Sequence, residues 1–253
     1  MNQINQQHIV IVVGDLGSGV NMVKNVLLLS PQVDFPKISI SRVEYIKNLV
    51  YPAQLKNNLK KWTKFEYKLR NWKTRYQVDI ADFYADINTV NVITASQHSY
   101  VVFITHWPDI AMQLKTKYPN IQLVSLYAAT DEELHWQINT YIEKVGIENL
   151  QNFSFLNDID KQKIKYIDQH GINEYYKFNV INMFEVMKDR LPSYNLLPAH
   201  QISIGELHTF KWLEHLHDFL NIELDLDQAR SLVKTWQDFH QPIKWSKNTY
   251  ESN

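Results

Sequence analysis

The chain has 253 residues, of which 45% are hydrophobic and 13% aromatic, enough to bury a sizeable core in one large domain or two small ones. Its formal net charge of -1 gives no overall attraction to nucleic acid or to an anionic membrane. The absence of cysteine excludes disulfides and thiolate metal sites. No apolar run approaches the roughly 20 residues of a membrane span. Residues 1–7 lack the features of a signal peptide, so we expect a cytoplasmic protein.

A strand, a glycine-rich loop and a helix follow one another near the start of the chain. The β-branched run Ile9–Val13 predicts a strand buried on both faces of a parallel sheet. Gly14, Gly17 and Gly19 come next, and from Val20 onward apolar residues recur at the spacing of a helix. This arrangement directs free backbone N–H groups and the positive end of a helix dipole toward one point, where an anion can bind. The simpler interpretation is a turn that only connects a strand to a helix.

The loop partly matches one known phosphate-binding signature. In the P-loop pattern G-x-x-x-x-G-K-S/T, Gly14 and Gly19 are in place, whereas Val20 and Asn21 replace the lysine and the hydroxyl residue. The dinucleotide pattern G-x-G-x-x-G has no correct spacing here.

The next part of the chain has fewer signals. Two prolines predict a loop over 30–36, and Ser41 can cap a helix over 42–50. Residues 55–76 form a basic, helical stretch with interleaved aromatic residues. Such a stretch can bind a polyanion, but the near-zero net charge favours an amphipathic helix with a solvated cationic face.

Two further strand–helix units are predicted in the middle of the chain. Strand 100–104 is followed by a helix from Pro108 to Lys117, because proline is favoured in the first helical turn. Strand 121–127 is followed by a helix that Thr130 and Glu133 open as a capping box and that runs to about residue 145. Alternating strands and helices imply right-handed crossovers and a parallel sheet.

A histidine stands at the end of the second strand, in the segment Thr105-His106-Trp107-Pro108. Parallel sheets bind ligands at the carboxyl ends of their strands, and a neutral imidazole can accept a proton near pH 7. The alternative is a hydrogen-bonded structural histidine.

The C-terminal part is predicted to be mainly helical, and no repeat or linker requires a domain boundary, so we treat 1–253 as one domain. A helix over 206–220 would carry His208, His215 and His217, but no metal-binding motif is present, and we expect no metal. The predicted elements are helices at 158–169, 175–190, 206–220 and 225–239, a strand at 200–204 and a basic tail at 240–247.

Taken together, these segments resemble the sulfotransferase family. Gly17–Asn21 occupies the place of the family's P-K-S-G-T-T loop, and Thr105–Pro108 looks like its K-T-H-L-P segment. Ile204–Leu207 and Phe219–Ile222 are similar to its "E-D-L" and "F-L-G" succession. The short format also resembles sulfotransferase-like proteins of marine bacteriophages. The resemblance implies a three-layer α/β/α fold with a central parallel sheet, of the P-loop NTPase-like type.

The resemblance implies sulfuryl transfer from 3′-phosphoadenosine 5′-phosphosulfate (PAPS) to a hydroxyl or amine of a small-molecule or glycan acceptor. By this resemblance His106 is the catalytic base. The loop would hold the phosphosulfate, and the basic tail would lie where some members place a phosphate-binding loop. The implied donor-binding residues are Gly14, Gly17, Ser18, Gly19, Val20, Asn21, Lys244 and Lys247.

The sequence departs from the family at its cationic positions. The loop lysine aligns with Gly17, and the 3′-phosphate arginine and serine align near Ala129 and Gln137. Arg42, Lys47 or the tail are the available replacements. Each lost charge-assisted bond costs about 1.5–3 kcal/mol.

Two other functions stay open. The first is an inactive sulfotransferase-like binding or assembly component, for instance in a virus particle, with a homo-oligomer or an assembly partner. The second is a nucleotide phosphotransferase, which the missing P-loop lysine weakens. We expect neither nucleic acid nor membrane as a partner.

Overall fold

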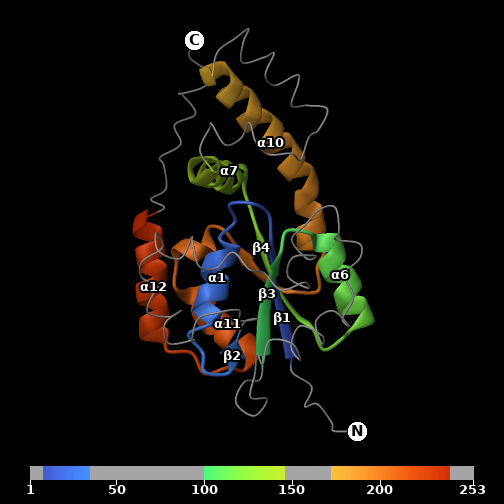
Figure 1. The fold of residues 1–253 in the computed structure, drawn as a ribbon, viewed down its shortest axis with the longest axis vertical. Helices are drawn as coiled ribbons and strands as arrows, with labels where there is room; N and C mark the ends of the chain where they lie inside the picture. Colours follow the sequence, from blue (N-terminus) through green and yellow to red (C-terminus); the bar gives the residue numbers. More distant parts are fainter. Residues whose placement is uncertain (1–7, 35–99, 146–171, 240–253) are drawn as a thin grey trace.

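The computed structural model describes residues 8–34, 100–145 and 172–239 (Figure 1). They contain a five-stranded sheet with the order β2-β3-β1-β4-β5, in which every neighbouring pair is parallel. The strand that leads into the glycine loop is therefore the central one. The strands are β1 (His8–Gly14), β2 (Val33–Asp34), β3 (Tyr100–Thr105), β4 (Gln122–Tyr127) and β5 (His200–Ser203).

The central strand is buried on both faces, as its β-branched run predicted. Val12 pairs with Ile104 on one side and with Val124 on the other. Successive side chains of a strand point to opposite faces, so Val10 and Val12 enter one core and Ile9, Ile11 and Val13 enter another. None of these five residues is more than 4% exposed.

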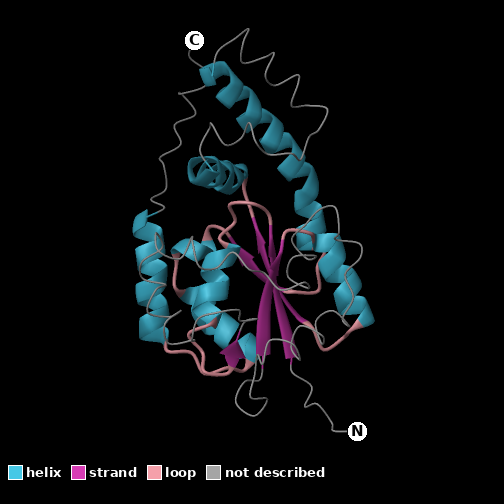
Figure 2. Ribbon diagram, viewed as in Figure 1, coloured by secondary structure: helices cyan, strands magenta, loops and turns pink. Residues whose placement is uncertain are grey.

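Helices cover both faces, which gives three layers (Figure 2). The core that contains Val10 and Val12 also contains residues of three helices on that face. The opposite core contains residues of α6 and the end of α10. The helices of the first face are α1 (Val20–Leu27), α11 (Lys211–Leu220) and α12 (Leu226–Phe239), and those of the second are α6 (Pro108–Lys117) and the C-terminal part of α10 (Ile172–Asn195).

A third apolar cluster lies at the carboxyl edge of the sheet. It joins Leu134 and Ile138 of α7 (Asp131–Val145) to Met187 of α10, with Leu16 of the glycine loop packed against it. Figure 1 shows α7 above the strand ends and α10 rising beside it. The ligand-binding edge of a parallel sheet is therefore partly covered by these two helices.

Several predicted elements differ from the structure. The predicted loop over 30–36 contains the short strand β2, which exists through its pairing with β3. The predicted helix 206–220 is divided into a 3-10 turn, η3 (Glu206–His208), and α11, because Thr209 is extended, with φ -113° and ψ 173°. His208 is therefore not on the helix that carries His215 and His217. Helix α10 is longer than predicted, since it continues through Pro192 to Asn195.

The other helices and strands agree with the prediction to within a few residues. The capping box at the start of α7 is half formed: the Glu133 N–H donates to Thr130 Oγ1 at 3.2 Å, whereas the Glu133 carboxylate accepts from the Ala129 N–H at 2.8 Å. The elements predicted at 42–50, 55–76, 158–169 and 240–247 lie outside the described residues. In the ranges that are described, none of the helices combines the length and hydropathy that crossing a membrane requires.

Candidate functional site

The glycine loop forms a tight turn between β1 and α1. The Ser18 N–H donates to Asp15 O at 3.1 Å. Gly17 and Gly19 have φ of 82° and 90°, a left-handed conformation that costs other L-residues free energy. Gly19 is the N-cap of α1, with no side chain to cap the helix. Backbone conformation alone therefore accounts for the glycines at positions 17 and 19.

The loop also packs closely against other elements. A Cβ at Gly17 would collide with the backbone oxygen of Gln137 in α7, and one at Gly19 would contact Leu207 and Trp236. Gln137 Nε2 in turn donates to Leu16 O at 2.9 Å. Helix α7 therefore holds the loop through backbone contact and through one hydrogen bond.

Several donors at the start of α1 have no acceptor within the described part of the chain. They are the backbone N–H groups of the loop and of the first helical turn, together with the Ser18 hydroxyl, which is fully buried. Buried polar groups normally have a partner, and a bound anion at a helix N-terminus would supply one. The backbone N–H groups are those of Gly17, Gly19, Val20 and Asn21.

His106 lies against the start of this loop. Its Nδ1 is 2.7 Å from Gly14 O. A carbonyl oxygen can only accept, so Nδ1 carries the proton in this contact, and in the neutral ring the lone pair is on Nε2. The imidazole is thus held in the tautomer that carries its lone pair on Nε2.

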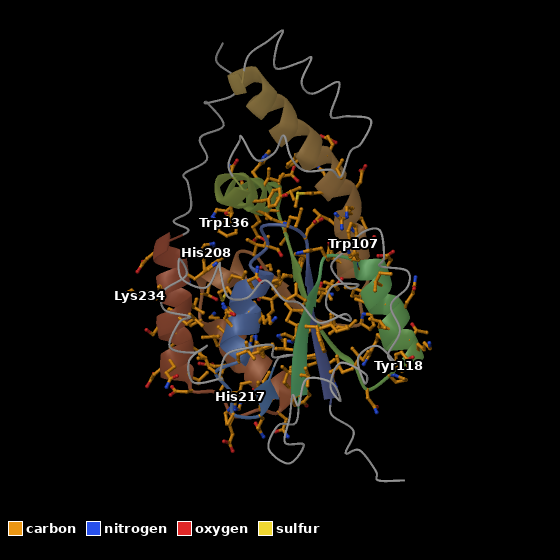
Figure 3. All side chains as sticks on the ribbon, viewed as in Figure 1. Trp107, Tyr118, Trp136, His208, His217 and Lys234 are labelled. Carbon is orange, nitrogen blue, oxygen red and sulfur yellow. The ribbon has the colours of Figure 1, made fainter. Side chains whose placement is uncertain are left out.

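A partly buried ion pair joins the loop to α10. Arg190 Nη1 donates to Asp15 Oδ1 at 3.1 Å and lies 2.9 Å from Oδ2, an approach that is an ion pair but not a second aligned hydrogen bond. Nη2 donates to His106 O at 2.8 Å and to the Tyr194 hydroxyl at 3.2 Å. The Tyr194 hydroxyl donates to the same His106 oxygen at 3.0 Å. The guanidinium carbon lies over the Trp107 ring, 5.2 Å from its centre, and Figure 3 places this residue where α6 begins, beside α10.

Burial perturbs the acids of this cluster. Removal from water raises the pKa of Asp15, against the opposing charge of Arg190 and the hydrogen bond from the Leu16 N–H. Burial and the negative charge of Asp15 raise the pKa of Tyr194 well above its ordinary value, and they raise that of Tyr141 to about 12. Both phenols are therefore neutral donors at physiological pH.

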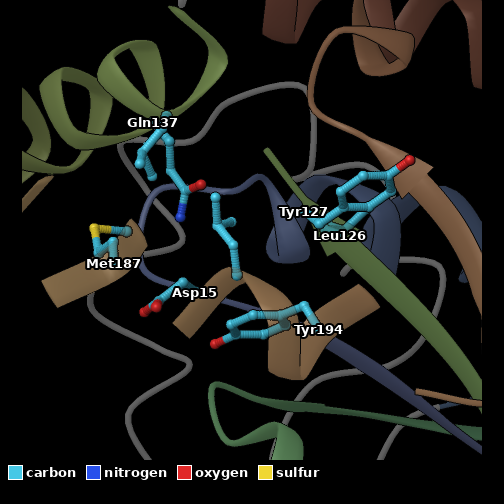
Figure 4. A pocket seen from close by; sticks show the side chains of 8 residues that line it. Asp15, Leu126, Tyr127, Gln137, Met187 and Tyr194 are labelled. Carbon is cyan, nitrogen blue, oxygen red and sulfur yellow. The ribbon is translucent and has the colours of Figure 1, made fainter. Parts of the chain in front are cut away.

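A small cavity adjoins the ion pair (Figure 4), lined by Asp15, Gln137, Met187 and Tyr194 among others. The centre of a water molecule can move through about 10 Å³ of it, which is the room that one ordered water needs. The cavity is too small for a nucleotide.

The structure brings His106 together with Gly14 and places the other predicted loop residues in one turn. Val20 is 4% exposed and its side chain belongs to the core, so only its backbone is available to a ligand. The Asn21 side chain is exposed. The predicted tail residues Lys244 and Lys247 lie outside the described residues, as do Arg42 and Lys47.

The positions that align near the family's 3′-phosphate residues have other contacts: the Ala129 N–H binds Glu133, and Gln137 binds the loop. Sequence reasoning missed Arg190, which is 175 residues from Asp15. Its only local signal is its position four residues before Tyr194, on one face of a helix.

Among the described residues, no group of three His, Asp or Glu side chains is placed to hold a metal ion. Comparisons with models of known protein families and with curated proteins found no match to this chain.

Proposed function

We propose that this chain has a P-loop-type, sulfotransferase-like fold and transfers a sulfuryl group from PAPS to a hydroxyl or amine acceptor. The observation that carries the proposal is the contact between His106 Nδ1 and Gly14 O. It sets the histidine of the T-H-W-P segment against the strand end that opens the glycine loop, across 92 residues of sequence. A base and an anion-binding loop are the two parts that in-line sulfuryl transfer requires.

In the proposed reaction, Nε2 of His106 takes the acceptor proton as the acceptor oxygen or nitrogen attacks sulfur. The bond between sulfur and the bridging phosphate oxygen breaks, and its electron pair stays on the leaving phosphate. The bond from Nδ1–H to Gly14 O strengthens as the imidazolium forms, because its donor becomes charged. The N–H groups of Gly17, Gly19, Val20 and Asn21, together with the Ser18 hydroxyl, stabilise the developing negative charge.

We also propose a cytoplasmic location. The absence of cysteine is compatible with a reducing compartment. The acceptor is a small molecule or a glycan.

Calorimetric titration with 3′-phosphoadenosine 5′-phosphate (PAP), the product of the donor, tests the loop. Ser18→Ala removes a buried hydroxyl without a partner, so the free protein should be as stable as the wild type or more stable. If that hydroxyl binds the phosphate, the same variant should bind PAP about 10- to 150-fold more weakly, which corresponds to one charge-assisted bond of about 1.5–3 kcal/mol.

Ser30→Ala is the matched control, because Ser30 is equally buried but accepts from the Gln32 N–H beyond the far end of α1. It should reduce stability slightly and leave PAP binding unchanged. His106→Ala should abolish sulfuryl transfer while PAP still binds. Absence of PAP binding at millimolar concentration would overturn the proposal.

The second candidate is an inactive binding or assembly component of the same fold. The observation in its favour is the contact of α7 with Gly17, which covers the loop on one side. For this candidate we expect a folded protein without PAP binding that sediments as a homo-oligomer or forms a complex with an assembly partner.

A further inference from the structure

The side chain of Arg190 connects the two halves of the proposed site. It bonds to Asp15, the first residue after β1, and to the backbone oxygen of His106 at the end of β3. It comes from α10, an element that supplied none of the predicted site residues. The Arg190 guanidinium therefore bridges the glycine loop and the end of β3.

The guanidinium has capacity for a further ligand. Of its five N–H donors, one contacts Asp15, and the two on Nη2 contact His106 O and the Tyr194 hydroxyl. The Nε–H and the second Nη1–H have no acceptor among the residues described, and 29% of the side-chain surface is exposed. The guanidinium lies over the Trp107 ring and is held by three hydrogen bonds, so it is pre-organised for an oxyanion.

A second observation indicates an anion at the glycine loop. The fully buried Ser18 hydroxyl has no partner in the described chain, and it belongs to the same five-residue loop as Asp15. An anion there would meet the nearly fully buried carboxylate of Asp15, which is 6% exposed and repels it. Arg190 neutralises that charge.

We propose that Arg190 binds the anionic group of the donor at the glycine loop, and that Asp15 competes with this anion for the guanidinium. Arg190 thus takes the part of the loop lysine that this sequence lacks, and Asp15 limits the affinity. The inference rests on the proposed function for the identity of the donor. The inference itself requires only that the ligand carries a phosphate-type oxyanion.

The proposal predicts that substitutions of Arg190 and of Asp15 change the anion affinity in opposite directions. Titrations with PAP and with inorganic pyrophosphate should show binding weakened about 10- to 100-fold in Arg190→Ala and strengthened several-fold in Asp15→Asn. Arg190→Lys should bind with intermediate affinity, because an ammonium has charge but no planar fork. If the pair were only structural, both single substitutions would lower the melting temperature and neither would strengthen anion binding.

Two further variants keep the test decisive. The double variant Asp15→Asn/Arg190→Ala buries no unpaired charge, so we expect it to fold even if Arg190→Ala does not. It should bind pyrophosphate more weakly than Asp15→Asn alone. Arg230→Ala is the control, since Arg230 is an arginine of α12 that pairs with Glu214 at 3.2 Å on the surface. It should bind both anions as the wild type does.

The outcomes separate this inference from the proposed function. If the wild type binds PAP and the Arg190 variants bind it equally well, only the inference falls. If pyrophosphate binding depends on Arg190 and Asp15 as expected but PAP does not bind, the inference stands and the sulfotransferase proposal falls. If the wild type binds neither anion at millimolar concentration, both are overturned.

Discussion

Substitution of Gly17 by alanine tests how the glycine loop meets helix α7. Gly17 has φ of 82°, and a Cβ there would collide with the backbone oxygen of Gln137 and approach the Cβ of Tyr141. The obstacle is mainly the backbone of a helix and not the end of a flexible side chain. The loop or the helix must therefore shift to accept one methyl group.

The expected loss of folding free energy has two parts. A left-handed conformation costs alanine about 1–2 kcal/mol, and a methyl group forced into a packed interior costs about 1–3 kcal/mol. Gly17→Ala should therefore lose about 2–5 kcal/mol. That is a large fraction of the total stability of a domain.

Urea unfolding followed by tryptophan fluorescence measures this loss. Gly205→Ala is the control, because Gly205 has φ of -62°, which alanine adopts readily, and the only group that its Cβ would crowd is the carboxylate end of the Glu133 side chain. We expect the control to lose less than about 1 kcal/mol, since reduced chain entropy offsets the displaced hydrogen bond. A loss of under about 2 kcal/mol in Gly17→Ala would refute the packing of α7 on the loop, since backbone strain alone would account for it.

Two further predictions concern the supporting structure. Thr130→Ala should destabilise the protein by about 1 kcal/mol in urea unfolding, since it removes the hydroxyl that accepts from the Glu133 N–H; an unchanged midpoint would contradict this capping role. Burial lowers the pKa of His135, His200 and His208 below 6.5. The unfolded chain therefore binds more protons as the pH falls through 6.5, and the free energy of unfolding should decrease from pH 7 toward pH 5. His208→Gln should reduce this decrease, and an identical pH dependence in the variant would contradict the assignment.

The types of the described elements were readable from the sequence because their signals are local. A run of β-branched residues at 9–13 predicted a strand buried on both faces, and it is the central strand. The Thr130 capping residue predicted the start of α7. Strand β2 was missed because two residues carry no periodicity, and their conformation depends on pairing with β3.

The glycine loop and the histidine after β3 were found from sequence for the same reason, since each follows directly on a strong strand signal. The sequence predicted only that they lie at the same edge of the sheet, because parallel strands end at one edge. It did not predict which of their atoms are in contact. The tautomer of His106 and the packing of Gly17 depend on single contacts between elements. No spacing rule predicts such contacts.

By itself, then, the sequence determined the α/β class, the strand–loop–helix unit and the position of His106 after a strand, because propensity, periodicity and capping act over a few residues. Only the tertiary structure decided that Arg190 meets Asp15 and that α7 covers one side of the loop. These contacts join residues more than 100 positions apart. They form because the packing of whole helices on a twisted sheet brings together side chains that have no local relation in the chain.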